Sequence, residues 1–323
     1  PEPLILTRMT TASRWLVLKF GGTSVADAVN WDTIAEIVRS RREVGFRPVV
    51  VLSALAGVTN LLEALPARAL EGTHAEVLAE LDARHDRLAS DLELPPSQTA
   101  GLLASDREEL RELTEGVALL REVTPRTRAR ILPFGERMAT RLGASYLASR
   151  GLGGTWVDVR DMLTSVDGAG VAEPTAYLSA SCEAAPDPMA VALLEKVDGV
   201  PVTQGFTARN AEGETVVLGR GGSDTAAAYI AGKLTATRLE IWTDVPGMFT
   251  ADPRVVPSAR LLRQLDYREA QEIATTGSRV LHPRCIPALR DHQVPIHIYS
   301  TPNPKVEGTV IRRGAAEGPA QVK

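Results

Sequence analysis

A glycine-rich segment with a Ser-Asp-Thr cluster carries the residue types best suited to binding an anion. It runs from Val216 to Ala228, where an apolar strand enters the turn Gly219–Gly222 and a helix is predicted over Ala226 to Leu234. Glycine lets the backbone approach a ligand closely, and a helix N-terminus offers unpaired N–H groups. The segment therefore predicts an anion site at a strand-to-helix junction. An ordinary capped turn is the structural alternative.

Three side chains of this segment add chemistry. Arg220 presents a planar fork that suits a carboxylate or a phosphate. Ser223 or Asp224 is predicted to cap the helix. A carboxylate beside an anion site is unfavourable unless it orders cations or a metal ion, so we expect Asp224 to do this.

A second candidate follows the apolar run Trp15–Phe20, which Lys19 interrupts near its end. Ligands of open α/β sheets bind beyond the carboxyl ends of the strands, where Lys19 would place an ammonium group. Gly21 and Gly22 follow at once and are predicted to present N–H groups to phosphate oxygens. Lysine is common at strand ends, so this pattern gains its weight from the other candidates.

Hydroxyl residues follow the next apolar strand, Arg47–Leu52. Ser53 and Thr59 are predicted to donate hydrogen bonds to a bound carboxylate. Thr59 and Asn60 fit equally well as the cap of a helix over Leu61 to Leu70.

Glu136 is a carboxylate with two possible settings. It could face the pocket and bind a substrate ammonium group. It could also pair with Arg137 or Arg141 on a solvated helix face, which the sequence alone slightly favours.

Polar residues also end the strand predicted over Arg238 to Thr243. Asp244 is predicted to bind a ribose hydroxyl or to order metal-bound water, and an Asx turn with Pro246 is the alternative. Phe249 and Arg254 offer an aromatic face and a cation to a nucleotide. Arg279 is a second candidate cation for phosphate.

Apolar strands alternate with helical patterns along most of the chain, which predicts an α/β fold with a largely parallel sheet covered on both faces. We expect one domain over residues 14–313, with a helical excursion at about 61–122 that could serve as a lid or a subunit contact. His74 and His85 in this excursion are expected at the surface. Residues 1–13 are expected to be disordered, and 314–323 to form a flexible tail.

The composition excludes several classes of protein. With 323 residues and 44% apolar content, the chain can bury a large core without cross-links. Its 36 basic and 40 acidic residues are mixed along the chain, so we expect neither a nucleic acid nor a membrane as partner. Cys182 and Cys285 have no metal-ligand spacing, and no secretory signal is evident. These features favour a cytoplasmic protein.

The candidate residues together comprise two glycine turns, separate cations and one organising carboxylate. This set suits phosphoryl transfer, where catalysis rests on positioning and on neutralising charge. The sequence contains no G-x-x-x-x-G-K-[ST] P-loop and no H-R-D or D-F-G set, which excludes the two commonest nucleotide-binding kinase folds.

Motifs spread over nearly the whole chain resemble the catalytic domain of aspartate kinases. They are Lys-Phe-Gly-Gly-Thr-Ser-Val (19–25), Val-Leu-Ser-Ala (51–54), Gly-Val-Thr-Asn (57–60), Phe-Gly-Glu-Arg (134–137), Gln-Gly-Phe (204–206), Gly-Arg-Gly-Gly-Ser-Asp-Thr (219–225), Trp-Thr-Asp-Val-Pro-Gly (242–247), Asp-Pro-Arg (252–254) and Val-Leu-His-Pro (280–283).

The resemblance implies the amino-acid-kinase fold, a three-layer α/β/α sandwich. It implies transfer of the γ-phosphoryl group of ATP to the side-chain carboxylate of L-aspartate, the first step toward lysine, threonine and methionine. Mg²⁺ would be held by phosphate oxygens and waters, without a protein metal site. The carboxylate nucleophile is ionised at pH 7 and needs no general base. We also expect a homodimer.

The resemblance also implies roles for individual residues. Lys19 would stabilise the transferring phosphoryl group, with Gly21 and Gly22 donating to it, and Asp224 would orient cationic side chains. Arg220 would hold a carboxylate of aspartate, and Glu136 its ammonium group. The other implied aspartate contacts are Ser53, Thr59, Phe206 and Ser223. The nucleotide side would comprise Lys19, Gly21, Gly22, Thr23, Thr243, Asp244, Phe249, Arg254 and Arg279.

The chain departs from the family pattern at Arg279, where a lysine is usual, and at Phe249, where a tyrosine is usual. Aspartate kinases usually continue into C-terminal ACT domains, or are fused to another enzyme such as diaminopimelate decarboxylase. We therefore expect this chain alone to be insensitive to lysine and threonine. The alternatives are a related kinase for glutamate, acetylglutamate or carbamate, and a non-catalytic nucleotide-binding or assembly module of the same fold.

Overall fold

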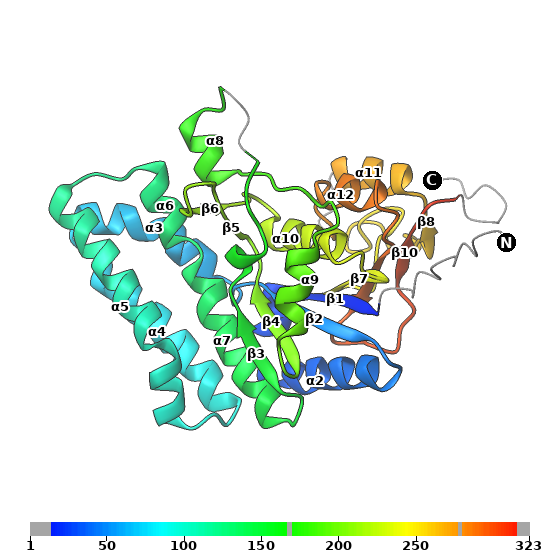
Figure 1. The fold of residues 1–323 in the computed structure, drawn as a ribbon, viewed down its shortest axis with the longest axis horizontal. Coiled ribbons are helices and arrows are strands. Elements are labelled where there is room, and N and C mark those ends of the chain that lie inside the picture. The colour runs from blue at the N-terminus through cyan, green and yellow to red at the C-terminus, as the bar shows by residue number, and fades with distance from the viewer. Residues whose placement is uncertain (1–13, 167–169, 277–279, 315–323) are drawn as a thin grey trace, which may run out of the picture.

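A computed structural model describes residues 14–166, 170–276 and 280–314 (Figure 1). The predictions for residues 1–13 and for nearly all of the tail lie outside the described residues, as does Arg279.

An eight-stranded sheet forms the centre of the molecule, with the strand order β3-β4-β2-β1-β7-β9-β10-β8. Neighbouring strands are parallel except β9 and β10, which confirms the predicted sheet type. The strands are β1 (Trp15–Phe20), β2 (Arg47–Leu52), β3 (Gly154–Val157), β4 (Val200–Gln204), β7 (Arg238–Thr243), β8 (Gln264–Leu265), β9 (Ile296–Ser300) and β10 (Thr309–Ile311). A separate antiparallel pair comprises β5 (Thr207–Arg209) and β6 (Thr215–Val217).

Helices cover both faces of the sheet, because its central strands are apolar on both sides. Leu16 and Leu18 of β1 join one buried cluster, whereas Val17 joins the other. The first cluster includes α2 (Ala28–Glu43) and α7 (Phe134–Ser149). The second includes α9 (Pro188–Glu195), α10 (Gly222–Lys233), α11 (Tyr267–Thr275) and α12 (Cys285–Arg290). This is the three-layer α/β/α architecture that the resemblance implies.

Three long helices leave the sheet on one side of the molecule and form the left part of Figure 1. They are α3 (Val58–Glu71), α4 (His74–Asp91) and α5 (Pro96–Leu120). The prediction that His85 lies at the surface is wrong: it is fully buried, and its Nδ1 lies 2.7 Å from the Leu81 carbonyl oxygen. Burial lowers the pKa of His85, because the apolar surroundings disfavour the charged ring.

Short helices complete the chain: α1 (Gly22–Val25), α6 (Pro125–Ile131), η1 (Val159–Asp161) and α8 (Glu173–Leu178). Two predicted helix starts are wrong. Helix α3 begins at Val58 after Gly57, and α10 begins at Gly222 after Gly221, with both capping glycines at positive φ. Neither Thr59 nor Ser223 caps its helix, because a glycine in the left-handed region already turns the chain into the first helical residue.

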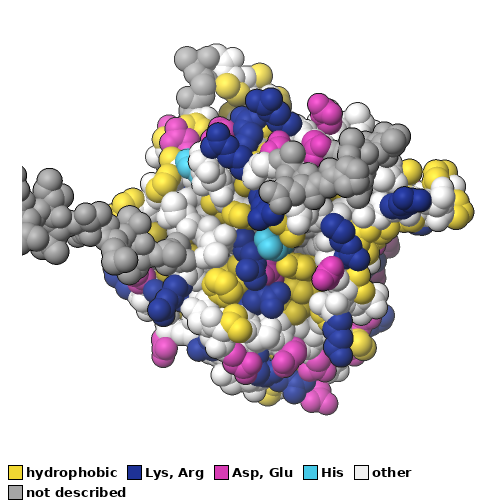
Figure 2. All heavy atoms as spheres, turned by 90° about the vertical axis from the view of Figure 1, so that its right-hand side faces the viewer, with side chains coloured by type: hydrophobic (Ala, Val, Ile, Leu, Met, Phe, Trp, Pro, Cys, Tyr) yellow, Lys and Arg dark blue, Asp and Glu magenta, His cyan; other side chains and the backbone are white. Residues whose placement is uncertain are grey.

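Figure 2 shows one face of the molecule, on which basic and acidic side chains are interspersed with apolar ones. Among the described residues no helix is long and apolar enough to span a membrane. Cys182 and Cys285 are both free and buried.

Glu240 of β7 is a fully buried charge next to the central strand. It accepts hydrogen bonds from Arg41 of α2 at 3.0 and 3.2 Å, from Arg238 at 2.8 and 2.6 Å, and from the Trp242 indole at 3.1 Å. These five bonds compensate the desolvation of the carboxylate.

Replacing Glu240 with alanine is expected to lower the free energy of unfolding by about 3 kcal/mol, because two guanidinium groups lose their common partner. Denaturant unfolding measures this change. The control is Glu195→Gln, which breaks an exposed pair with Arg47 at 3.6 Å. That control should change stability by less than about 0.5 kcal/mol, and an equal loss in both variants would contradict the prediction.

Candidate active site

The carboxyl ends of four adjacent parallel strands carry most of the predicted site residues. Lys19 of β1 lies in register with Val51 of β2 on one side and Ile241 of β7 on the other, and β2 is followed by β4. The strand order thus places Ser53, Phe206 and Thr243 at the same edge of the sheet as Lys19. The chain passes from β1 to β2 on one side and returns with β7 on the other, and this reversal of strand order makes the edge beside β1 the expected ligand site.

Lys19 forms an ion pair with Asp224 in the first turn of α10. Both side chains are largely buried, with 10% and 16% of their surface exposed. Asp224 therefore orders a cation at the end of β1.

The Gly21–Gly22 turn is only partly available to a ligand. The Gly21 N–H donates to the Trp242 carbonyl oxygen of β7 at 3.0 Å, so it does not point to a phosphate as predicted. Gly22 and Thr23 open helix α1 and are too near its start for intrahelical bonds. A Cβ at Gly22 would lie 2.7 Å from the Ala54 carbonyl oxygen, so only glycine fits this close approach.

Glu136 of α7 faces the interior, and its predicted pairing with Arg137 or Arg141 on a solvated face is wrong. Those two arginines pair instead with Asp106 of α5. Glu136 has 4% of its surface exposed and accepts a hydrogen bond from the Ser223 hydroxyl at 3.2 Å. Burial raises its pKa to about 7, while the Ser223 hydroxyl and the charge of Lys19 act in the opposite direction.

Phe206, the second residue after β4, adopts a strained backbone conformation. Its φ is 65°, and the Thr207 N–H donates to the Gly205 carbonyl oxygen at 2.7 Å, which closes a three-residue γ-turn. The Leu218 N–H donates to the Phe206 carbonyl oxygen at 2.8 Å. These bonds hold Phe206 against the glycine-rich segment, as is common for strained residues at functional sites.

The glycine-rich segment packs between two side-chain rings. A Cβ at Gly222 would lie 2.5 Å from the Phe206 ring, and one at Gly221 would lie 2.2 Å from the His282 ring. Gly221 also has a φ of 66°. His282 accepts a long 3.4 Å hydrogen bond from the Arg284 N–H, which suits a local structural role for this ring.

Gly221→Ala is expected to lower the free energy of unfolding by about 3 kcal/mol, of which about 1–2 comes from the backbone conformation and the rest from the clash with His282. Gly213→Ala is the matched control, because Gly213 has a φ of 81° but no atom within 4 Å of the added Cβ. The loss of unfolding free energy in Gly213→Ala therefore measures the contribution of the backbone conformation alone. Equal losses of unfolding free energy in the two variants would show that the His282 ring moves away from the added Cβ without a further loss of stability.

The remaining aspartate candidates stand at the rim of the site. Arg220 is exposed, and Ser53 and Thr59 are partly buried. The Ser53 N–H donates to the Phe20 carbonyl oxygen at 3.2 Å, which ties the end of β2 to the end of β1.

The nucleotide candidates form a group beyond the end of β7. The Thr243 hydroxyl donates to Asp244 at 3.1 Å. The hydrogen bond and the charge of Asp252 raise the pKa of Arg254, and the charge of Asp244 acts in the same direction. Arg254 binds Asp252 through two side-chain bonds of 3.0 and 2.9 Å and is exposed. Phe249 pairs with Leu261 in a β-bridge. Arg279 belongs to this prediction but lies outside the described residues.

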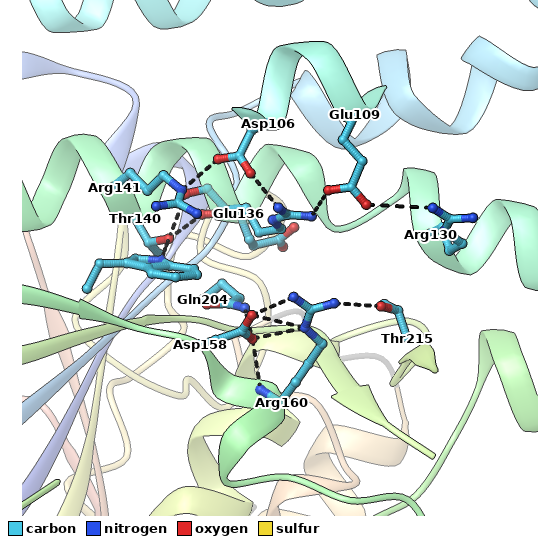
Figure 3. Close-up of polar contacts among 12 residues, drawn as sticks. Asp106, Glu109, Arg130, Glu136, Thr140, Arg141, Asp158, Arg160, Gln204 and Thr215 are labelled. Atoms are coloured by element: carbon cyan, nitrogen blue, oxygen red, sulfur yellow. Dashed lines mark hydrogen bonds and ion pairs between the residues drawn. The ribbon is translucent and has the colours of Figure 1, made fainter. Parts of the chain in front are cut away.

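Sequence reasoning missed a polar chain that braces the site (Figure 3). The fully buried Gln204 amide donates to Asp158 at 2.7 Å, and Asp158 accepts several bonds from Arg160. Arg160 in turn donates to the Thr215 hydroxyl of β6 at 2.9 Å. The chain thus links β4, just before Phe206, to the hairpin before the glycine-rich segment. No local motif marks it, because its members lie in three separate segments.

The assembled site holds a paired lysine and aspartate, a buried glutamate and a glycine-rich turn at one sheet edge. Such a set can bind an ammonium group and stabilise negative charge on a phosphoryl group.

Comparisons with known proteins agree with this fold. The profile of the amino acid kinase family matches residues 14–300. Lysine-sensitive aspartokinase 3 of Escherichia coli is 38% identical over 306 residues, which cover 93% of this chain and 64% of that protein. Chloroplastic aspartokinase 1 of Arabidopsis thaliana is 31% identical over 310 residues, which cover 92% of this chain and 52% of that protein.

Among solved structures, E. coli aspartokinase III in complex with aspartate and ADP superimposes with a TM-score of 0.82 at 34% identity, covering 94% of this chain and 66% of that one. UMP kinase from Bacillus anthracis shares the fold alone, with a TM-score of 0.51 at 16% identity. The chain spans about half to two thirds of the length of the aspartokinases named here. With the family profile matched over nearly all of the described residues, this chain belongs to the amino acid kinase family.

Proposed function

We propose that this chain catalyses the aspartokinase reaction. It transfers the γ-phosphoryl group of ATP to the side-chain carboxylate of L-aspartate and produces 4-phospho-L-aspartate and ADP. The similarity to a structure of E. coli aspartokinase III with aspartate and ADP supports these substrates. The ion pair of Lys19 and Asp224 at the end of β1 is the observation that carries the proposal, because it fixes a cation where charge must be neutralised.

The phosphoryl group passes between two oxygens and leaves little covalent chemistry to the protein. Lys19 stabilises the negative charge that spreads over the transferring group, and Asp224 keeps the ammonium group in place. The Gly22 N–H is the remaining backbone donor that we assign to this group. The aspartate carboxylate is already ionised at pH 7, so the site needs no general base.

Aspartate is held by its two charged ends. Glu136 binds the ammonium group, and its burial strengthens this interaction because little water competes. Arg220 binds a carboxylate through its planar fork. Further contacts are assigned to Ser53, Thr59, Phe206 and Ser223.

The nucleotide lies beyond the end of β7. The group around Thr243 and Asp244 supports this placement, because Asp244 is exposed and free to meet a ribose hydroxyl. We assign Thr23, Phe249, Arg254 and Arg279 to the same side.

Mg²⁺ fits this site only as a partner of the phosphates. Among the described residues no cluster of three histidine, cysteine or acidic side chains could hold a metal ion, and Asp224 is neutralised by Lys19. Mg²⁺ commonly keeps several waters and binds substrate phosphates. When bound with ATP it would supply further charge neutralisation.

A homodimer and a cytoplasmic location remain predictions from the resemblance and the composition. Light scattering of the purified chain would establish its oligomeric state.

Trapping of the acyl phosphate with hydroxylamine tests the proposed reaction. Hydroxamate should form with ATP, Mg²⁺ and L-aspartate, and should not form with L-glutamate or without an amino acid. Equal products from glutamate would indicate another member of the family. A blank with every amino acid, from protein that binds ATP, would support the non-catalytic alternative.

A further inference from the structure

We propose that Asp106 is a positioning residue of the aspartate site: from helix α5 it holds Arg137 and Arg141 of α7 and thereby sets the orientation of Glu136. The inference rests on the proposed function, because it concerns the residue that binds the ammonium group of aspartate.

Asp106 is a fully buried carboxylate shared by two guanidinium groups (Figure 3). Its Oδ1 lies 2.5 Å from Nη2 of Arg137, and its Oδ2 lies 2.7 Å from Nε of Arg141. Arg137 also contacts Glu109 of α5 at 3.0 Å. A charge buried in this way is stable only while both partners are present, so the contact between α5 and α7 has one favoured arrangement.

These contacts fix the rotation of α7 about its axis. Arg137 and Arg141 are four residues apart and share one helix face, whereas Glu136 points about 100° away from Arg137. Each arginine is also braced from the side: Arg141 lies 3.9 Å from the Trp156 ring centre, and Arg137 lies 4.6 Å from that of Phe134. Because α7 cannot rotate while its Arg137 and Arg141 face is held by α5, the direction in which Glu136 points is fixed as well.

Glu136 has few contacts of its own that would keep its carboxylate in place. The Ser223 hydroxyl gives it one hydrogen bond of 3.2 Å. The Ala54 backbone also favours its ionised form, but no hydrogen bond of good geometry reaches Glu136 Oε2 within the described part of the chain. The orientation of the Glu136 side chain therefore depends on the rotation of α7 about its axis.

The neighbouring residue on α5 provides a matched control. Arg107 follows Asp106 directly but pairs with Asp82 of α4 at 2.9 Å. Asp82→Asn removes a carboxylate that pairs with an arginine of α5 and not with Arg137 or Arg141.

The kinetic test compares Asp106→Asn and Asp82→Asn in the full chain. D106N is expected to raise the KM for aspartate about 10-fold and to leave the KM for ATP within about twofold, because a misplaced binding group weakens one substrate. D82N should leave both within about twofold. Equal increases of both KM values in D106N, or an unchanged KM for aspartate, would overturn the proposal.

A double-mutant cycle separates positioning from a general loss of packing. If Asp106 acts through Glu136, the KM for aspartate in D106N/E136Q should match that of E136Q within about twofold. If the increases in the KM for aspartate caused by D106N and by E136Q multiply in the double variant, Asp106 does not act through Glu136. Arg137→Lys keeps the charge with fewer donors and should raise the KM for aspartate about threefold, which keeps the proposal testable if D106N does not fold.

A substrate-free measurement distinguishes this inference from the proposed function. The titration of Glu136 can be followed by ¹³C NMR in the wild type, with E136Q to assign the signal. Lys19, paired with Asp224, is a charged group that acts on Glu136 and favours its ionised form. D106N should move the midpoint down toward the ordinary value by at least about half a pH unit as the carboxyl group meets water, whereas D82N should leave it unchanged. An unchanged midpoint in D106N would overturn the proposal even if the wild type does not phosphorylate aspartate.

Discussion

Replacing Lys19 with alanine is expected to lower aspartate-dependent turnover about 100-fold or more, because a fixed cation in a site of low water content stabilises the charge of the transition state. The variant also leaves Asp224 without its partner, so a negative charge remains beside the phosphates. Both effects act on the chemical step, and the KM for aspartate should change less than kcat. Hydroxamate formation and ADP release under saturating substrates measure the loss.

Lys233→Ala is the matched control for this variant. Lys233 lies at the other end of α10 and pairs with Asp187 at 3.0 Å, with a similarly small exposed fraction of 13%. It should keep turnover within about twofold, because the pair is far from the strand ends. A near-normal rate in K19A would remove Lys19 from the mechanism.

Glu136→Gln is expected to raise the KM for aspartate about 10- to 100-fold, because the ion pair between the carboxylate and the ammonium group becomes a weaker hydrogen bond from the ammonium group to a neutral amide oxygen. The KM for ATP should stay within about twofold. The exposed Glu36, which pairs with Arg39, provides the control, and Glu36→Gln should change neither value. An unchanged KM for aspartate in E136Q would contradict the assigned role.

The pH dependence of aspartate binding follows from the raised pKa of Glu136, about 7. The ionised form binds the ammonium group, and burial favours the protonated form of the free enzyme. The kcat/KM for aspartate should therefore be constant above about pH 7 and fall about tenfold per pH unit below it. E136Q should lack this slope. A profile that stays flat from pH 5 to pH 8 would show that Glu136 is ionised throughout.

Much of the fold was predictable because it depends on local patterns. The apolar runs within Trp15–Phe20 and Arg47–Leu52 became central strands, as mostly apolar sequence in a parallel sheet implies. The junction of β6 and α10 was predictable in kind, since glycines followed by small residues indicate a tight turn into a helix. The N-terminal cap of α10 was not predictable, because a sequence that contains both glycine and Ser-Asp is compatible with a cap by a left-handed glycine and with a cap by a side chain.

The setting of Glu136 could not be predicted from nearby residues. Its neighbours Arg137 and Arg141 offered an obvious pairing, but Asp106 binds both from a helix about 30 residues earlier. Likewise, the Gly21 N–H was expected to face a ligand, and Trp242 accepts it from a strand far along the chain. Such competition between local and distant partners is decided by tertiary packing.

The position of β1 between β2 and β7 also bears on how the chain folds as it is synthesised. β2 follows β1 closely, but β7 emerges roughly 200 residues later, which at about 5–20 residues per second corresponds to about 10–40 s. During this interval one edge of β1, a strand that is buried along its whole length in the folded protein, has no partner and is open to pairing with other chains. Helices α2 and α7 are built in the meantime and cover one face of the nascent sheet, while the edge of β1 stays open. Nascent chains arrested before Arg238 should therefore aggregate more readily than chains released after Thr243.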